Sequence, residues 1–120
     1  MNRLARTTGI LVFTIVAATS APANSGQAAR VGDNHICPQV TALVPHVGGP
    51  VLPPGAPSVL ICGKPAAVVG TPLQCKGPPD LIVRGSSTVM IGGKPAARVG
   101  ELTAHGGTIT SGCGNVMIGN

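Results

Sequence analysis

Short apolar runs set off by glycine and proline are the main feature of the hydrophobic pattern. Three of them, at residues 59–61, 89–91 and 116–118, have the sequences Val-Leu-Ile, Val-Met-Ile and Val-Met-Ile. After the first two runs come Gly and Lys-Pro, and the chain resumes with Ala-Ala-x-Val-Gly. Proline fixes φ and has no amide proton, so Gly-Lys-Pro ends one strand and Ala-Ala-x-Val begins another. The pattern therefore predicts short β-hairpins.

These hairpins belong to an internal repeat. Residues 55–70 align without a gap on residues 85–100, at an offset of 30. Residues 112–120 match the first half of the unit, and residues 28–32 supply a second half at the other end of the chain. Three first halves and three second halves, circularly permuted, indicate pseudo-threefold symmetry within one chain. Helices are disfavoured, because no apolar stretch of helical period after residue 31 runs ten residues without Gly or Pro.

Composition narrows the class of protein. Gly and Pro make up a quarter of the 120 residues, yet 43% of the residues are apolar and only 9% charged, which excludes a disordered chain. There is no Trp or Tyr and a single Phe, so the core of the one predicted domain consists of small aliphatic side chains. The net charge of +5 comes from scattered residues without aromatic partners, which disfavours nucleic-acid binding.

The N-terminal segment has the pattern of a targeting signal. Arg3 and Arg6 precede an apolar stretch at residues 9–18, and Ala21-Pro22-Ala23 follows. This order predicts a secretory signal peptide within residues 1–27, too short to span a bilayer, and a mature domain at residues 28–120. The alternative is a mis-assigned start, with a cytoplasmic protein that begins near Gln27.

Cysteine and histidine carry the candidate chemistry. The cysteines are Cys37, Cys62, Cys75 and Cys113, and the histidines are His35, His46 and His105. The cysteines form no CxxC pair and occupy unequal places in the repeat, so symmetric disulfide stapling is not indicated. The threefold axis should instead bring Cys75, His105 and either Cys37 or His35 to one end, with His46 nearby. Three imidazoles and one thiolate suit tetrahedral Zn²⁺.

The repeat resembles a known family. Pro95-Ala-Ala-Arg98 stands beside Pro65-Ala-Ala-Val68 and Gln27-Ala-Ala-Arg30, and residues 28–120 as a whole are similar to PAAR-repeat proteins, the tips of type VI secretion spikes. The stretches at residues 33–38, 45–50, 75–80 and 103–107 also match in order and spacing. Val68 departs from the motif, since it replaces the name-giving arginine in one copy.

The resemblance implies a fold, a metal and a partner. It implies a small cone of three pseudo-equivalent β-units, whose broad base caps the trimeric valine-glycine-repeat spike protein (VgrG) and so aids membrane puncture and effector delivery. The chain is expected to be a monomer by itself, assembled in the cytoplasm and delivered outside the cell, whereas its N-terminal segment indicates export to the periplasm. One structural zinc is expected near the apex, with Cys37 as the alternative to one of four ligands. By position, these ligands are His35, His46, Cys75 and His105.

Two other classes of function remain open. A zinc hydrolase needs an open coordination position and usually a carboxylate base, and the acids are only Asp33, Asp80 and Glu101, so an enzyme is not expected. The other class is an exported binding module stapled by disulfides among all four cysteines. Zinc binding would leave every thiol free in denatured protein, whereas stapling would leave none.

Overall fold

The computed structural model describes residues 25–119, which form an all-β fold of twelve short strands in six two-stranded antiparallel sheets. Residues 1–24, which hold most of the predicted signal peptide, lie outside this part. No helix occurs among the described residues, and so none is long and apolar enough to cross a membrane. Strand β1 (Gly26–Ala28) begins two residues before the predicted domain start, and it pairs with β12 (Cys113–Ile118).

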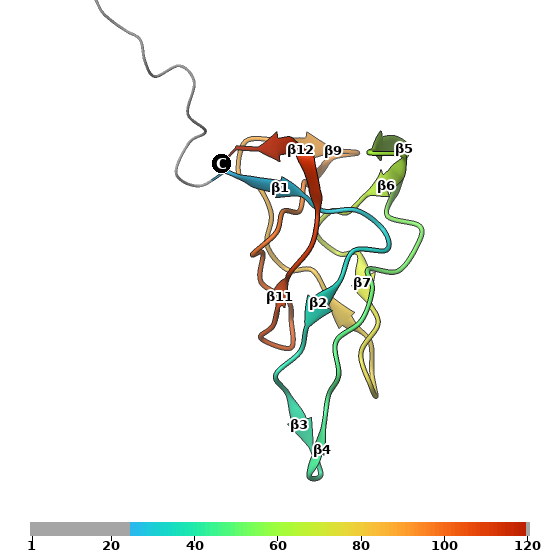
Figure 1. Cartoon of the computed structure of the whole chain (residues 1–120), viewed down its shortest axis with the longest axis vertical. Coiled ribbons are helices and arrows are strands. Elements are labelled where there is room, and N and C mark those ends of the chain that lie inside the picture. Colours follow the sequence, from blue (N-terminus) through green and yellow to red (C-terminus); the bar gives the residue numbers. More distant parts are fainter. Residues whose placement is uncertain (1–24, 120) are drawn as a thin grey trace, which may run out of the picture.

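Three hairpins form the broad end of the molecule (Figure 1). They are β5 (Ala56–Ile61) with β6 (Lys64–Ala66), β9 (Met90–Ile91) with β10 (Lys94–Pro95), and β12 with β1. In the third hairpin the two ends of the described chain pair, with Gln27 opposite Met117. The circular permutation predicted from the repeat is therefore confirmed.

A closed ring of hydrogen bonds marks the pseudo-threefold axis. The amide of Ala29 donates to the carbonyl of Ala97, Ala97 donates to Ala67, and Ala67 donates to Ala29, at 3.0, 2.9 and 2.9 Å. The three alanines are completely or almost completely buried. Three Cβ atoms converge at the axis, and each of the three units has alanine at this position. Larger side chains would overpack the centre.

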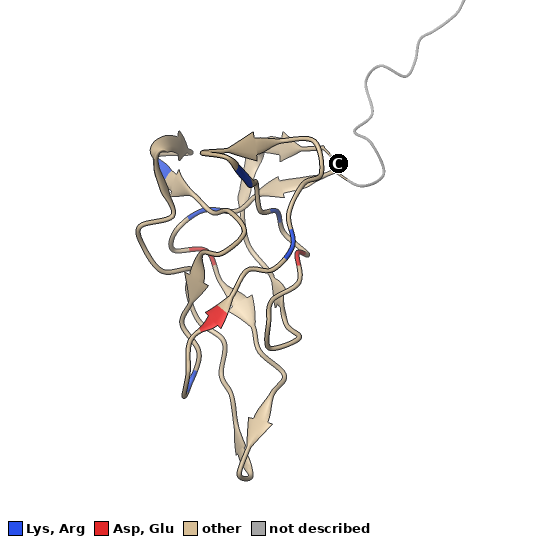
Figure 2. Cartoon of the chain, turned by 180° about the vertical axis from the view of Figure 1, so that it is seen from behind, with Lys and Arg blue, Asp and Glu red and all other residues tan. Residues whose placement is uncertain are grey.

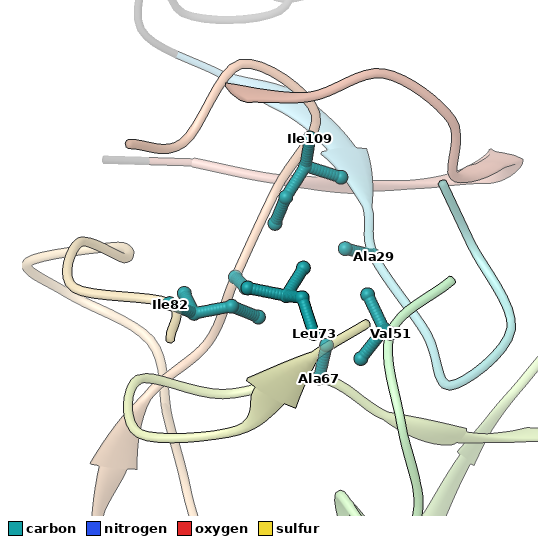
Figure 3. Packing of buried hydrophobic residues seen from close by; sticks show 7 residues of the cluster. Ala29, Val51, Ala67, Leu73, Ile82 and Ile109 are labelled. Atoms are coloured by element: carbon teal, nitrogen blue, oxygen red, sulfur yellow. The ribbon is translucent and has the colours of Figure 1, made fainter. Parts of the chain in front are cut away.

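Two layers of small aliphatic side chains stack along this axis. In the layer drawn in Figure 3, the ring alanines pack against one branched residue from each unit, Val51, Ile82 and Ile109, and against Leu73. The layer nearer the base contains the preceding alanine of each unit together with Ile61, Cys113 and Ile118. The core has no aromatic residue, as the composition predicts.

The turn that follows each ring alanine has the same backbone in all three units. Gly32, Gly70 and Gly100 each have φ of +93°, a conformation that glycine adopts without strain. Two of the units close this turn with an ion pair, from Arg30 to Asp33 and from Arg98 to Glu101. The third unit has Val68 and Thr71 instead, and there the Thr71 hydroxyl accepts the Val68 amide. In these two units the arginine of the repeat motif therefore stabilises the turn by pairing with the acid three residues later.

Below the core the molecule narrows. Strand β2 (His35–Ile36) pairs with β11 (Thr108–Ile109), and β7 (Pro72–Leu73) pairs with β8 (Asp80–Leu81). A last hairpin, β3 (Val40–Thr41) with β4 (Val44–Pro45), forms the narrow tip (Figure 1). The cone of short hairpins expected from the resemblance is thus present.

One disulfide joins two units at the broad end. It links Cys62, in the β5–β6 turn, to Cys113 at the start of β12, with the Cα atoms 6.3 Å apart. Cys37 and Cys75 are free thiols. The expectation that the four cysteines are either all free or all in disulfides is therefore wrong. One pair forms a disulfide and the other pair consists of free thiols.

Candidate metal centre

Four side chains converge where the cone narrows below the core. They are Cys37, His46, Cys75 and His105, and their ligand atoms all lie within 4.8 Å of one another. Cys37 follows β2, His46 follows β4, and Cys75 lies two residues beyond β7. The two cysteines and His46 are buried, and His105 is partly exposed. Three separate chain segments and the apical hairpin therefore meet at this cluster.

The repeat register explains three of these positions. Cys37, Cys75 and His105 are each the fifth residue after the glycine with φ of +93°. Equivalent positions in a threefold fold meet near the axis, so the cluster is a direct product of the symmetry. His46 is the fourth member and comes from the β3–β4 hairpin, an insertion of the first unit that folds back below the others.

His35 is the one position at which the structure differs from the ligand set expected from the sequence. In the repeat it is equivalent to Leu73 and Thr103, which are both buried in the layer above the cluster. His35 is likewise only 3% exposed, and its Nδ1 lies 2.8 Å from the Gly49 carbonyl oxygen, to which it donates. The structure therefore brings Cys37, the alternative, into the cluster, and places His35 beside it.

The spacing of the donor atoms fits a tetrahedral metal ion. Cys37 Sγ is 3.1 Å from Cys75 Sγ and 3.5 Å from His105 Nδ1, and His46 Nδ1 is 3.2 Å from Cys75 Sγ and 3.7 Å from Cys37 Sγ. Tetrahedral zinc with sulfur at about 2.3 Å and nitrogen at about 2.0 Å requires about 3.8 Å between two sulfurs and about 3.5 Å between sulfur and nitrogen, so the two cysteine sulfurs must move apart when an ion binds. With that adjustment, this set of two sulfur and two nitrogen donors could hold one Zn²⁺.

The surroundings of His46 suit the tautomer that a metal ligand needs. Its Nε2 lies 2.8 Å from the Thr41 hydroxyl oxygen, which is able to accept the ring proton. A proton on Nε2 leaves the Nδ1 lone pair free, and Nδ1 is the nitrogen that faces the two thiols. Such outer hydrogen bonds orient metal-bound imidazoles in proteins.

The Cys75 thiol is neutral without a metal. Burial and the hydrogen bond with Cys37 together raise the pKa of Cys75 to about 11. Both effects disfavour the thiolate that a metal requires. Metal binding must therefore release protons, so the affinity of this site should increase with pH.

Asp80 supports the cluster from one side. It is fully buried, and its Oδ1 accepts the backbone amides of His105 at 2.9 Å and Leu81 at 2.8 Å. Burial alone would raise the pKa of this carboxyl group, but hydrogen bonds from the Thr103 hydroxyl and these two amides outweigh it, so the pKa is lowered. Its Oδ2 faces His35 Nε2 at 3.4 Å, but the two atoms form no hydrogen bond, and neither has a hydrogen-bond partner.

Sequence reasoning missed this buried His35–Asp80 pair. Asp80 has no acidic counterpart in the other two units, where the equivalent residues are Gly49 and Gly107. A side chain at Gly107 would collide with the backbone carbonyl of Ile36, so the glycine there is required by close packing. The signal in the sequence was that an acid stands where the other two units have glycine, and a histidine stands where they have Leu73 and Thr103.

Comparison with known proteins agrees with this architecture. A family model described as the PAAR motif matches residues 41–111, more than half of the chain. The matched range contains His46, Cys75 and His105, whereas Cys37 precedes it. No curated protein sequence matches the chain at a significant level.

Proposed function

The chain belongs to the PAAR-motif family, and on this premise we propose that it is the metal-stabilised tip of a type VI secretion spike. The broad end would cap the blunt end of the trimeric spike protein VgrG, with one copy of this chain on each trimer. The narrow end would lead through the target membrane and aid effector delivery. The chain would be loaded in the cytoplasm and delivered outside the cell.

The single observation that carries this proposal is the symmetric apolar base. The middle residue of each Val-x-Ile run points outward at the broad end, so that Leu60 is 63%, Met90 55% and Met117 51% exposed. These residues occupy equivalent positions in β5, β9 and β12. A trimer presents three identical surfaces around one axis, and a single chain with three equivalent contacts matches that arrangement.

Backbone pairing at the base supports the same contact. Among the described residues, β5, β9 and β12 each pair with one neighbouring strand only. Their outer edges can therefore accept further strands, and a β-structured partner would cover them.

The metal has a structural role in this proposal, and zinc is the ion that the donor set favours. Four protein donors fill a tetrahedron and leave no open position for a substrate. All three acids of the described chain are buried, and each has a hydrogen-bonded partner, so none is placed as a general base toward solvent. These features support a non-enzymatic tip.

Binding to the purified spike trimer tests the proposal. Native mass spectrometry should find one copy of this chain on each trimer, because the chain already contains three units. Leu60→Asp should weaken binding strongly, since it puts a charge into an apolar contact. Lys76→Gln, a change near the narrow end, is the matched control and should leave binding unchanged. Three copies on each trimer, or no binding at all, would contradict the proposal.

A thiol count tests the rival function of a binding module held by disulfides alone. Denatured, unreduced protein should show two free thiols, from Cys37 and Cys75, because the other two cysteines form the disulfide. After removal of zinc with a chelator the count should stay at two. A count of zero would favour the stapled module.

A further inference from the structure

The turn between β3 and β4 forms the narrow end of the cone (Figure 1). Leu43 is 94% exposed at this turn, and the flanking Val40, Val44 and Val47 are exposed as well. No charged residue occurs between Asp33 and Lys64 in the sequence. Leu43 is therefore the most exposed large hydrophobic side chain of the described residues, and it lies in a segment without charged residues.

The backbone of this turn makes its apolar residues unexpected. Ala42 and Leu43 have φ of 49° and 65°, in the left-handed region. A two-residue hairpin turn of this kind strongly prefers Asn-Gly, and other residues raise its energy. Hairpin stability therefore does not explain leucine at this position. A contact made by the side chain itself would explain it.

The charge that lies beside the tip hairpin is positive. The exposed Lys76 lines a pocket of about 210 Å³ together with Thr41 and Val44, so its side chain lies against the hairpin. The three acids, red in Figure 2, lie higher in the cone and are buried. An apolar point with a lysine beside it matches the boundary between acyl chains and anionic headgroups.

We propose that the β3–β4 turn inserts into the interface of an anionic lipid bilayer, with Leu43 among the acyl chains and Lys76 at the level of the phosphates. The exposed apolar side chains amount to only a few hundred Å² on a convex point, whereas a stable protein interface needs about 800 Å² on each partner. Insertion is shallow, because the outer edges of a two-stranded hairpin keep backbone groups that hydrocarbon cannot satisfy.

This inference deepens the proposed tip function, on which its biological setting rests, but its test needs no spike protein. The chain contains no tryptophan, so a single introduced tryptophan reports on its own surroundings. The full chain with Leu43→Trp is mixed with vesicles of phosphatidylethanolamine and phosphatidylglycerol. Its emission should shift to the blue, and brominated acyl chains should quench it. The matched control, Leu60→Trp at the base, should show neither effect.

The control also separates the tip from the apolar stretch at residues 9–18. Strand β1, the first strand after that stretch, lies at the broad end (Figure 1). Vesicle binding through the N-terminal segment would bring the base to the lipid, and the tryptophan of Leu60→Trp would then respond. A response of that variant without one from Leu43→Trp would overturn the proposal.

A second pair of variants rules out misfolding as the cause of any loss. Ala42→Asn with Leu43→Gly supplies the residues that the turn prefers, so thermal stability should be kept or increased. Affinity for the anionic vesicles should nevertheless fall about tenfold, because most of the inserted apolar surface is removed. Lys76→Gln should lower it about fivefold at low salt, and phosphatidylcholine vesicles should bind more weakly than anionic ones.

Three results would contradict lipid insertion. The first is unchanged vesicle affinity in the Asn-Gly variant. The second is binding to anionic vesicles without a blue shift from Leu43→Trp, which would mean surface adsorption by charge alone. The third is self-association that the Asn-Gly variant abolishes, which would make a second copy of this chain the occupant of the tip. Spike binding measured on the same variants should stay unchanged, so failure here is distinct from failure of the proposed capping role.

Discussion

The broad and narrow halves of the cone are stabilised in different ways. In the broad half, three equivalent units close around a ring of alanines and bury small aliphatic side chains. In the narrow half the units stop being equivalent, and buried polar groups and a Cys/His cluster replace the apolar layers. The described part of the chain has no Phe, Tyr or Trp and buries little surface near a point, so a metal ion at the cluster would supply stability that packing cannot.

The difference also separates two kinds of crosslink. The disulfide at the base joins β12 to the β5–β6 turn. Strand β12 pairs with β1, which comes from the other end of the described chain, so no turn connects these two strands. The cluster near the apex joins segments from three units and the apical hairpin. The disulfide therefore lies at the strand pair that no turn connects, and the cluster lies where the apolar layers end.

The largest expected effect comes from breaking the metal cluster. Cys75→Ser and His105→Ala should each lose zinc and destabilise the protein by on the order of 5 kcal/mol or more, because the narrow half has no apolar layer of its own. Thermal unfolding together with metal analysis measures both effects. Addition of a chelator to the unchanged protein should reproduce the loss. Full zinc occupancy in His105→Ala would show that the assignment of this cluster as the metal site is wrong.

His35 and Cys37 distinguish the two possible ligand sets. Cys37→Ser should lose zinc about as completely as Cys75→Ser, since both sulfurs belong to the cluster. His35→Ala should keep one zinc on each chain, although it should unfold at a lower temperature, because it leaves the buried Asp80 without its facing imidazole. The opposite result, zinc loss in His35→Ala alone, would restore the set expected from the sequence.

Breaking the disulfide should have the next largest effect. The bridged cysteines are 51 residues apart, and closing a loop of that length restricts the unfolded chain by about 4 kcal/mol in the chain-entropy account. Cys62→Ala with Cys113→Ala should therefore lower the free energy of unfolding by about 2–4 kcal/mol while zinc content stays at one. Denaturant titration of the zinc-loaded protein measures this. Zinc loss in the double variant would mean that the two halves of the cone are not independent.

The sequence predicted the broad half better than the narrow half, for a physical reason. Gly-Lys-Pro turns, Val-x-Ile runs and Ala-Ala-x-Val-Gly recur at fixed spacing, so the hairpins, the permutation and the axis all followed from local patterns. The cluster followed only in part. Cys75 and His105 were placed by the register, but the choice between His35 and Cys37 depends on which side chain turns toward the axis. That orientation is set by β2 pairing with β11, a contact between residues far apart in sequence.

The disulfide and the His35–Asp80 pair could not be predicted from spacing. Cys62 corresponds to Gly92 and Gly119 in the other units, and Cys113 corresponds to Ser86 and Ala56. Because both cysteines break the repeat at unrelated positions, symmetry gives no hint that they meet. The structure brings them together because the β5–β6 turn lies next to β12 around the base.

Asp80→Asn should have an intermediate effect that depends on pH. The variant keeps an acceptor for the His105 and Leu81 amides but loses the negative charge that strengthens these two hydrogen bonds, which should cost about 2–3 kcal/mol at neutral pH. The folded-state pKa of Asp80 lies below its ordinary value of 3.8, so its ionised form stabilises the fold at higher pH and this contribution is lost as the pH falls through the folded value. The difference in melting temperature between the two proteins should therefore shrink below about pH 4. A difference that grows on acidification would contradict the lowered pKa.

The smallest expected effect comes from restoring symmetry to the one unit that lacks the ion pair. A pocket of about 150 Å³ lined in part by Val68, Thr71 and Lys94 leaves room there for longer side chains. Val68→Arg with Thr71→Asp would rebuild the pair seen at Arg30 and Asp33, and it should change the free energy of unfolding by less than about 1 kcal/mol.

The single change Val68→Arg should instead destabilise the protein, because it puts an unpaired cation close to Lys94 in a buried position. A double-mutant cycle by denaturant unfolding measures the coupling between positions 68 and 71. Favourable coupling would show that the turn, which has the same φ in all three units, accepts the pair equally well in each of them. A coupling near zero would mean that the turn backbone alone does not position the acid for the arginine. Residues elsewhere in the unit would then be needed to form the ion pair.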